Sequence, residues 1–250
     1  MTLANLQGKI VVITGASSGI GAALAKAFSK VGARVALAAR REDRLKQIAA
    51  DCPSENLIVA ADVTDPNGRR SIIERTLDRW RRLDILVNNA GAGLYGKFSD
   101  TTEEEWRRLF EINFFSAVLL TKDALGIMLP QRQGIIINIA SIGGLIAHST
   151  KVTPYVASKH ALVGFSRGLA KDLAGTGIRV LAICPHITST DFFGVSVGAD
   201  DMAPEIEKYR SVMDTADEVA AGIIAQLDSE RLVVFPTKKP ARVYEKQRDI

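Results

Sequence analysis

Short apolar runs alternate with segments of helical period along almost the whole of this chain, and this alternation decides the fold. The runs that we expect to form strands are residues 9–14, 34–39, 57–60, 85–87, 135–140, 179–183 and 232–235. Helical spacing of apolar residues fills the intervals at 19–31, 42–50, 66–80, 103–129, 155–174 and 217–227. Such alternation builds a parallel sheet covered by helices on both faces. The sequence therefore predicts an α/β protein with a doubly wound parallel sheet of about seven strands.

The chain has the size and composition of one such domain. It contains 250 residues, of which 47% are hydrophobic, and this is enough for one large core. No linker or low-complexity tract divides it, so residues 1–250 are expected to form a single domain. The longest stretch without clear periodicity is 188–208, and apolar side chains continue to Met213. We expect residues 188–213 to form a lid over a substrate pocket, because long loops are often functional.

Charge patterning argues against a nucleic-acid partner. The formal net charge is +4, but the basic residues come in pairs, such as those at 69–70, 81–82 and 107–108, on helical faces that also carry acids. Such mixed faces are typically solvated. The more concentrated basic segment 238–248 is expected to lie on the surface.

The remaining composition indicates a cytoplasmic protein. We find no charged leader followed by an apolar run at the N-terminus, and no apolar stretch of the roughly 20 residues that span a membrane. The two cysteines, Cys52 and Cys184, are too few for a disulfide framework, and Cys184 is expected to pack as a small hydrophobic residue. No metal site is predicted.

A glycine-rich turn follows the first expected strand. Gly15, Gly19 and Gly21 stand between that strand and the first expected helix. Glycine there permits a tight turn and a close backbone approach to a pyrophosphate, which the amides at a helix N-terminus attract. The spacing G-x-x-x-G-x-G differs from the G-x-G-x-x-G fingerprint, so its position in the chain carries the prediction. The turn indicates a dinucleotide site.

The same turn also matches the nucleophile elbow of α/β-hydrolases. Residues 15–19 read G-x-S-x-G, with Ser17 as the central serine. An elbow normally follows several strands of the sheet, whereas this turn follows the first. The three histidines, His148, His160 and His186, show no signature of a general base. The dinucleotide interpretation is therefore favoured over the hydrolase.

Tyr155, Lys159 and Ser141 indicate a reaction. A lysine four residues after a tyrosine on a helix places an ammonium on the same face as the phenol. A nearby positive charge favours the phenolate, so we expect Lys159 to lower the pKa of Tyr155 and make it an acid/base near neutral pH. The Ser141 hydroxyl could hold a substrate oxygen. Together with a dinucleotide, these groups predict a carbonyl/alcohol oxidoreductase.

The motifs together resemble the short-chain dehydrogenase/reductase family over residues 8–191. The residues that carry the resemblance are Thr14 to Gly21, Asn88-Asn89-Ala90-Gly91, Asn113, Ser141, Tyr155-x-x-x-Lys159 and Pro185 to Thr190. The resemblance implies a Rossmann-type fold and a catalytic tetrad of Asn113, Ser141, Tyr155 and Lys159. Tyr155 would exchange a proton with the substrate oxygen as hydride moves to or from the nicotinamide, and Ser141 would bind that oxygen. Lys159 would also hold the nicotinamide ribose, and Asn113 would support a water-borne proton relay to the lysine.

The resemblance also implies which residues bind the cofactor. They are Gly15, Ser17, Ser18, Gly19, Ile20, Gly21, Arg40, Asp62, Val63, Asn89, Ala90, Gly91, Tyr155, Lys159, Pro185, Thr188 and Thr190. Two departures from the family pattern stand out. His186 occupies a position after Pro185 that is usually glycine, and the C-terminal segment lacks the glycine pair of many members.

The end of the second expected strand indicates NADP(H). An acidic side chain there would bind the ribose 2'-hydroxyl of NAD, whereas a basic one accommodates the 2'-phosphate of NADP. Ala39 stands where the acid would fall, and Arg40 follows it. Arg41 is expected to face solvent or make a secondary contact. An NAD-dependent alcohol or hydroxysteroid-type dehydrogenase and a catalytically silent dinucleotide sensor are the alternatives.

The expected substrate is a medium-sized apolar or aromatic ketone, aldehyde or secondary alcohol, or a carrier-bound acyl ketone. Its pocket walls are expected in residues 93–95, 142–147 and 192–213, which are rich in apolar side chains. The helices at 103–129 and 155–174 are apolar over more than one face, and related enzymes pair these helices between subunits. A homodimer or homotetramer is therefore expected.

Overall fold

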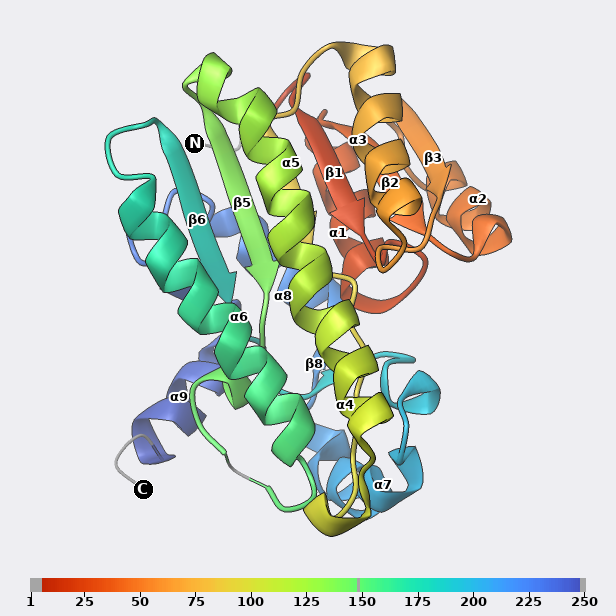
Figure 1. Ribbon diagram of the computed structural model, residues 1–250, viewed down its shortest axis with the longest axis vertical. Coiled ribbons are helices and arrows are strands. Elements are labelled where there is room, and N and C mark those ends of the chain that lie inside the picture. The colour runs from red at the N-terminus through yellow and green to blue at the C-terminus, as the bar shows by residue number, and fades with distance from the viewer. Residues whose placement is uncertain (1–5, 148, 248–250) are drawn as a thin grey trace.

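A seven-stranded parallel sheet forms the centre of the protein (Figure 1). The computed structural model describes residues 6–147 and 149–247, so His148 and Arg248 lie outside the described residues. The sheet order is β3-β2-β1-β4-β5-β6-β9, and every neighbouring pair is parallel. Its strands are β1 (Ile10–Thr14), β2 (Arg34–Ala39), β3 (Asn56–Ala60), β4 (Ile85–Asn88), β5 (Gly134–Ile139), β6 (Ile178–Ile183) and β9 (Val233–Val234). The order changes direction between β1 and β4, where ligands bind in sheets of this type.

Helices cover both faces of the sheet, which confirms the doubly wound α/β fold. They are α1 (Gly19–Lys30), α2 (Glu42–Ala50), α3 (Pro66–Trp80), α4 (Glu103–Phe110), α5 (Ser116–Gln131), α6 (Thr153–Asp172), α7 (Ala199–Tyr209), α8 (Ala216–Ala225) and α9 (Lys238–Gln247). Val11 and Ile13 of β1 point to a core shared with α1, α2 and α8. Ile10 and Val12 point to the opposite core, shared with α3, α5 and the end of α6. Both faces of the central strands β1, β4 and β5 are therefore buried, which explains their continuous apolar runs.

The expected helix at 103–129 is interrupted. Residues Glu111–Phe115 form a π-helical segment between α4 and α5. Asn113 lies in this segment. Its Oδ1 accepts a hydrogen bond from the Ala92 amide at 2.8 Å, and its Nδ2 donates one to the Ala92 carbonyl oxygen at 3.0 Å. A wider turn of this kind is common at functional sites and leaves the apolar spacing almost unchanged, so periodicity could not predict it.

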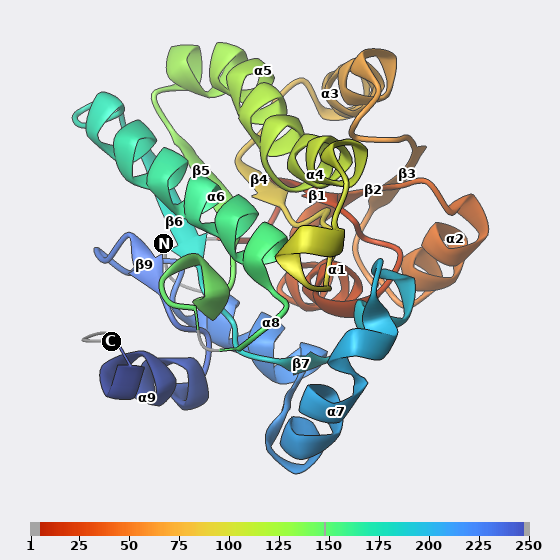
Figure 2. The same ribbon diagram turned by 60° about the horizontal axis from the view of Figure 1, so that its bottom comes forward.

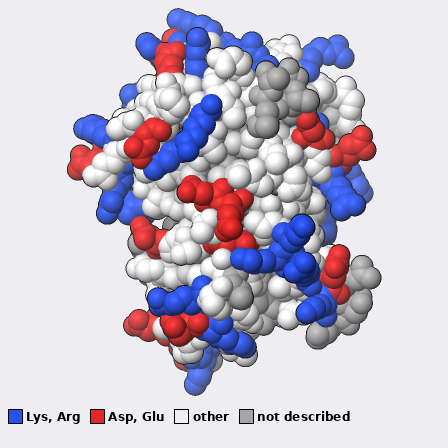
Figure 3. Space-filling view, turned by 180° about the vertical axis from the view of Figure 1, so that it is seen from behind, with Lys and Arg blue, Asp and Glu red and all other residues white. Residues whose placement is uncertain are grey.

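Two helices lie where the sequence indicated none. The stretch 188–208 contains the short strand β7 (Thr188–Ser189), which pairs with β8 (Asp214–Thr215), and most of α7. The basic segment near the C-terminus forms α9, and Lys239 joins it to β8 through Asp214 and the carbonyl oxygen of Met213. Figure 3 shows lysine and arginine side chains gathered beside this end of the chain.

Arg69 is buried, contrary to the expectation from the sequence. The pair 69–70 was expected on a solvated face, but Arg69 is only 8% exposed. Its guanidinium donates to the carbonyl oxygens of Val63 at 2.8 Å and Thr64 at 2.9 Å. This arginine therefore fixes the loop that follows β3.

The expectation that no apolar stretch is long enough to span a membrane is wrong for the run Glu103–Gln131, which is long and apolar enough by length and composition alone. In the structure its α5 part lies against β4, β5 and α3. Phe115 and Leu129 remain 46% and 42% exposed on its outer side. Packing on the sheet accounts for one apolar face of this run, and the described part of the chain leaves Phe115 and Leu129 on the outer face largely uncovered.

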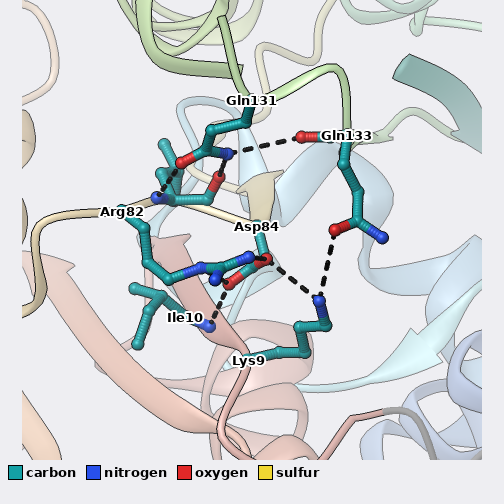
Figure 4. Close-up of polar contacts among 7 residues, drawn as sticks. Lys9, Ile10, Arg82, Asp84, Gln131 and Gln133 are labelled. Carbon is teal, nitrogen blue, oxygen red and sulfur yellow. Dashed lines mark hydrogen bonds and ion pairs between the residues drawn. The ribbon is translucent and has the colours of Figure 1, made fainter. Parts of the chain in front are cut away.

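The amino ends of the strands are joined by a cluster around Asp84 (Figure 4). Its carboxylate is 2% exposed and accepts bonds from the Ile10 amide at 2.9 Å and from the Arg82 Nε at 3.0 Å, with Lys9 Nζ at 3.3 Å. Gln131 nearby bonds both backbone groups of Leu83. The cluster ties β1, β4 and the end of α5 together.

Asp84→Ala should lower the free energy of unfolding by about 2 kcal/mol, because the buried amide of Ile10 loses its acceptor. Urea unfolding monitored by circular dichroism measures this. The exposed Asp78 on α3 supplies the control, since Asp78→Ala should change stability by less than about 0.5 kcal/mol. Equal midpoints for the two variants would contradict the role of the cluster.

Candidate active site

A cavity of about 390 Å³ opens at the carboxyl ends of the strands. Figure 2 shows this end of the sheet, with the loops after β1, β4, β5 and β6 facing the viewer. The expected site residues that line the cavity are Gly15, Ser17, Ser18, Gly19, Ile20, Arg40, Asp62, Val63, Asn89, Ala90, Gly91, Ser141, Tyr155, Lys159, Pro185, Thr188 and Thr190. Gly21 and Asn113 lie outside this lining.

The turns after β1 and β4 are joined to each other. Gly15 has a φ of 65°, and a Cβ at this position would lie 2.8 Å from Nδ2 of Asn89. That amide donates to the carbonyl oxygens of Thr14 at 2.9 Å and Gly15 at 3.3 Å. The Thr14 hydroxyl accepts from the amides of Asn89 and Ala90, each at 3.0 Å. Only glycine at position 15 permits this close approach.

The N-terminus of α1 fits an anionic group. Its N-cap residue, Ser18, makes no side-chain hydrogen bond to the first turn, so the first amides of the helix have no side-chain cap. Instead, the hydroxyls of Ser17 and Ser18 each accept a bond of 2.9 Å from Arg41. Open amides beside a guanidinium attract negative charge, as a pyrophosphate or a phosphate requires.

Arg40 and Asp62 lie at the same end of the cavity. Burial acts to raise the pKa of Asp62, but hydrogen bonds from the backbone and hydroxyl of Thr64 and the charges of Arg40 and Arg108 hold that pKa below its ordinary value. Asp62 is therefore ionised at neutral pH. Arg41 was predicted to face solvent or to make a secondary contact. In the structure it is exposed, and its guanidinium also donates hydrogen bonds to Ser17 and Ser18 of the glycine-rich turn.

Ser141, Tyr155 and Lys159 meet at the other end. Tyr155 lies in the first turn of α6, and Lys159 lies one turn later with 4% exposure. The Lys159 Nζ donates to the carbonyl oxygen of Ile139 at 2.9 Å and stands 5.8 Å from the centre of the Tyr155 ring. Ser141 follows β5 and accepts a 3.0 Å bond from the Gly143 amide. The helical spacing of Tyr155 and Lys159 is thus confirmed.

The expected lowering of the Tyr155 pKa is wrong for this structure. Burial of the phenol raises its pKa to about 12, and the Ser141 hydroxyl only partly opposes this. Burial also lowers the pKa of Lys159 to about 8, because an ammonium is costly to desolvate. Removal from water is therefore the main cause of both shifts, upward for the pKa of Tyr155 and downward for that of Lys159.

Asn113 is buried, with 1% exposure, and does not reach the cavity. Besides its two bonds to Ala92, its Nδ2 donates to the Ser158 hydroxyl at 3.0 Å, and Ser158 donates to the carbonyl oxygen of Tyr155 at 2.7 Å. Asn113 thus links the π-helical segment to the start of α6. Its contacts position the backbone around Tyr155.

Aromatic and aliphatic side chains enclose the Tyr155 end of the cavity. Tyr95 and Phe192 lie against Tyr155, with ring centres 5.8 Å and 5.9 Å away. Val152, Val156, Phe193 and Met202 complete this apolar wall. His186 also lines the cavity, and its ring meets Tyr209 edge to face with centres 5.7 Å apart. The unusual histidine therefore belongs to the pocket.

Comparison with known proteins shows the family of this chain. Residues 9–199 match the family model described as short chain dehydrogenase. This chain belongs to the short-chain dehydrogenase family. It is 40% identical over 188 residues to the granaticin polyketide synthase putative ketoacyl reductase 1 of Streptomyces violaceoruber, covering 72% of this chain and 68% of that protein.

Solved structures of short-chain dehydrogenases agree with the fold. One from Streptomyces avermitilis superposes with a TM-score of 0.85 at 32% identity, covering 96% of this chain and 91% of the other. One from Sphingobium yanoikuyae, solved in complex with NADPH, has a TM-score of 0.81 at 30% identity, covering 95% and 91%.

Some residues of this short-chain dehydrogenase site were missed from the sequence. Val152 and Val156 line the cavity, but no motif marks them. Tyr95 was only part of a wall at 93–95, and nothing in its neighbours indicated that it would meet Tyr155. Phe192 and Phe193 did indicate an apolar pocket wall in this region, because two adjacent phenylalanines in a loop pack against another apolar surface.

Proposed function

We propose that the protein reduces a ketone or aldehyde to an alcohol with NADPH. The observation that carries this proposal is one continuous cavity, lined at one end by Arg40, Arg41 and the turn before α1, and at the other by Ser141, Tyr155 and Lys159. A site for an anionic dinucleotide and a proton donor thus share one space. The ketoacyl reductase among its relatives and the NADPH complex of a related structure support the same reaction class.

The residues have distinct roles in this proposal. The turn at 15–21 and the open amides of α1 would hold the pyrophosphate, and Arg40 and Arg41 the 2'-phosphate. Asp62 and Val63 would lie beside the adenine, and Lys159 would bind the nicotinamide ribose. When bound, the dinucleotide supplies hydride. Tyr155 gives its proton to the carbonyl oxygen, while Ser141 donates a hydrogen bond to that oxygen as negative charge develops on it.

The protonation state of Tyr155 at neutral pH suits the proposed reduction. A phenol whose pKa is about 12 is protonated throughout the neutral range. The general acid for reduction is therefore present at full population, whereas the phenolate needed as a base for oxidation is scarce. Asn113 and Ser158 act as positioning residues through the backbone of Tyr155.

The proposal includes a lid and subunit pairing. Segment 188–213 supplies Phe192, Phe193 and Met202 to the pocket wall, which supports its place as a lid. The exposed outer side of the run Glu103–Gln131, with Phe115 and Leu129, supports pairing with another copy in a homodimer or homotetramer.

A panel of ketones and aldehydes tests the reaction, with the loss of NADPH absorbance as the readout. Apolar aryl and alkyl ketones should be consumed with stoichiometric formation of the alcohol, which chromatography identifies. If purified, folded protein that binds NADPH consumes none of the panel, the proposed reduction is wrong and a silent dinucleotide sensor takes its place.

The cofactor preference should reverse in the double variant Ala39→Asp, Arg40→Ser. A carboxylate at position 39 would bind the free 2'-hydroxyl of NADH and repel a phosphate, and the charge-assisted bond from Arg40 would be lost. NADPH affinity should fall about ten- to a hundredfold relative to NADH, as fluorescence titration measures.

Arg41 and Arg44 complete the cofactor experiment. Arg41→Ser should weaken NADPH binding further, because Arg41 contacts Ser17 and Ser18. Arg44, exposed on α2 and outside the cavity lining, is the matched control, and Arg44→Ser should leave the preference unchanged. An unaltered NADPH/NADH ratio in the double variant would show that the 2'-phosphate is recognised elsewhere.

A further inference from the structure

Among the residues that the structure describes, none forms a hydrogen bond with the hydroxyl of Tyr95, which belongs to the lining of the active-site cavity. Tyr95 is 5% exposed and lines the cavity. Across residues 6–147 and 149–247, its side chain makes ring contacts but no hydrogen bond. The hydroxyl is not among the fully buried polar atoms that lack a partner, so water or a ligand can reach it. A hydroxyl that is reachable from the cavity can find that partner in a ligand.

The surroundings of Tyr95 make its hydroxyl distinctive. Its ring is tilted by 50° to that of Tyr155, with centres 5.8 Å apart, and stacks on Phe193 at 6.0 Å. The neighbours that share this cluster are Val152, Val156, Phe192 and Met202, which offer no side-chain hydrogen bond donor. Two phenols therefore stand side by side in an otherwise apolar wall. The proposed reaction uses only one of them.

The backbone holds Tyr95 in place. A Cβ on Gly93 would lie 2.5 Å from the Tyr95 ring, so the ring packs directly across this glycine. The Tyr95 amide donates to the carbonyl oxygen of Val197 at 3.0 Å, and the Val197 amide donates back to Gly93 at 3.1 Å. The Gly93 amide also donates to the Ser196 hydroxyl at 3.1 Å. A ring fixed from two loops loses little freedom when a ligand binds, which favours recognition.

The charge state of Tyr95 defines the ligand atom. Burial, with a smaller contribution from Tyr155, raises its pKa far above the ordinary range of tyrosine. Tyr95 therefore stays a neutral phenol and a hydrogen bond donor at any working pH. A phenol can also accept a hydrogen bond, but a carbonyl substrate carries acceptor oxygens, so the complementary group here is an acceptor oxygen, such as a ketone or ester carbonyl.

We propose that Tyr95 binds a second oxygen of the substrate, and that the protein prefers apolar carbonyl compounds bearing another acceptor oxygen, such as dicarbonyls and keto esters. This inference rests on the proposed reduction at Tyr155. Tyr95 is then the residue that selects these substrates over simple ketones of the same size. It orients the substrate, so its contribution falls mainly on KM.

Tyr95→Phe tests the proposal, because it keeps the ring across Gly93 and removes only the hydroxyl. The substrates are two matched pairs: 1-phenyl-1,2-propanedione with propiophenone, and ethyl benzoylacetate with butyrophenone. For at least one pair, kcat/KM for the dioxygenated member should fall about tenfold more than for its monoketone, mainly through KM. Comparing each variant with the wild type removes the intrinsic reactivity of the dicarbonyls. Tyr244→Phe on α9, outside the cavity lining, is the hydroxyl control.

A binding experiment separates this inference from the proposed function. Titration of the NADPH-saturated Tyr155→Phe protein with the same compounds should show about tenfold weaker binding of the dioxygenated member once Tyr95→Phe is added. This readout needs no turnover, so it decides the role of Tyr95 even if no carbonyl is reduced. Equal losses for both members of each pair, in kinetics and in binding, would overturn the proposal.

Discussion

Tyr155→Phe should lower the turnover of carbonyl reduction at least about a hundredfold, the usual scale for a lost general acid. The phenylalanine ring keeps the contacts with Tyr95 and Phe192, and only the proton donor disappears. NADPH affinity should stay within about twofold of the wild type. Steady-state kinetics and fluorescence titration on one preparation measure both quantities.

The control for this prediction is Tyr244→Phe on α9, where the Tyr244 ring lies against Phe235. It should retain wild-type turnover. Because the Tyr155 pKa is about 12, reduction by the wild type should show no loss from phenol ionisation between pH 6 and about 9. Near wild-type turnover in a folded Tyr155→Phe protein would contradict the role of Tyr155 as the general acid.

Lys159→Met should weaken NADPH binding about ten- to a hundredfold and lower turnover with it, because a charge-assisted bond to the cofactor is lost. The methionine side chain fills similar space in a site that is 4% exposed. Lys171→Met, on the exposed last turn of the same helix, is the matched control and should bind normally.

The pH dependence gives Lys159 a second signature. Burial lowers its pKa to about 8 in the free protein, so the ammonium is present below that pH and lost above it. NADPH affinity should therefore fall as the pH rises through about 8, by up to tenfold per unit, since binding favours the charged form. The Lys159→Met protein should lack this decline. A wild-type affinity that is flat from pH 7 to 9.5 would contradict the assignment.

The strands and the site motifs could be predicted because each depends on local sequence. A buried parallel strand is a continuous apolar run, and Tyr155 and Lys159 are neighbours through helical spacing alone. The π-helical turn at Asn113 and the helix α7, with two aspartates and Pro204, leave no such local pattern.

The other features of the site could not be predicted from the sequence, because they depend on contacts between residues that are far apart in the chain. The Tyr155 pKa depends on how completely neighbours from four segments remove water, which spacing does not reveal. Tyr95 meets Phe193 and Tyr155 only after two loops converge on the start of α6. Likewise, the contact between Arg41 and Ser17 joins the end of β2 to the turn after β1.

The Asp84 cluster and the cavity lie at opposite ends of the same strands. β1 has five residues, so at about 3.3 Å per residue the two regions are roughly 16 Å apart. Perturbations at such separations usually combine additively in free energy. Resistance to heat or denaturant can therefore be adjusted at the amino ends of the sheet while the chemistry at its carboxyl ends stays the same, so the two properties can evolve or be engineered independently.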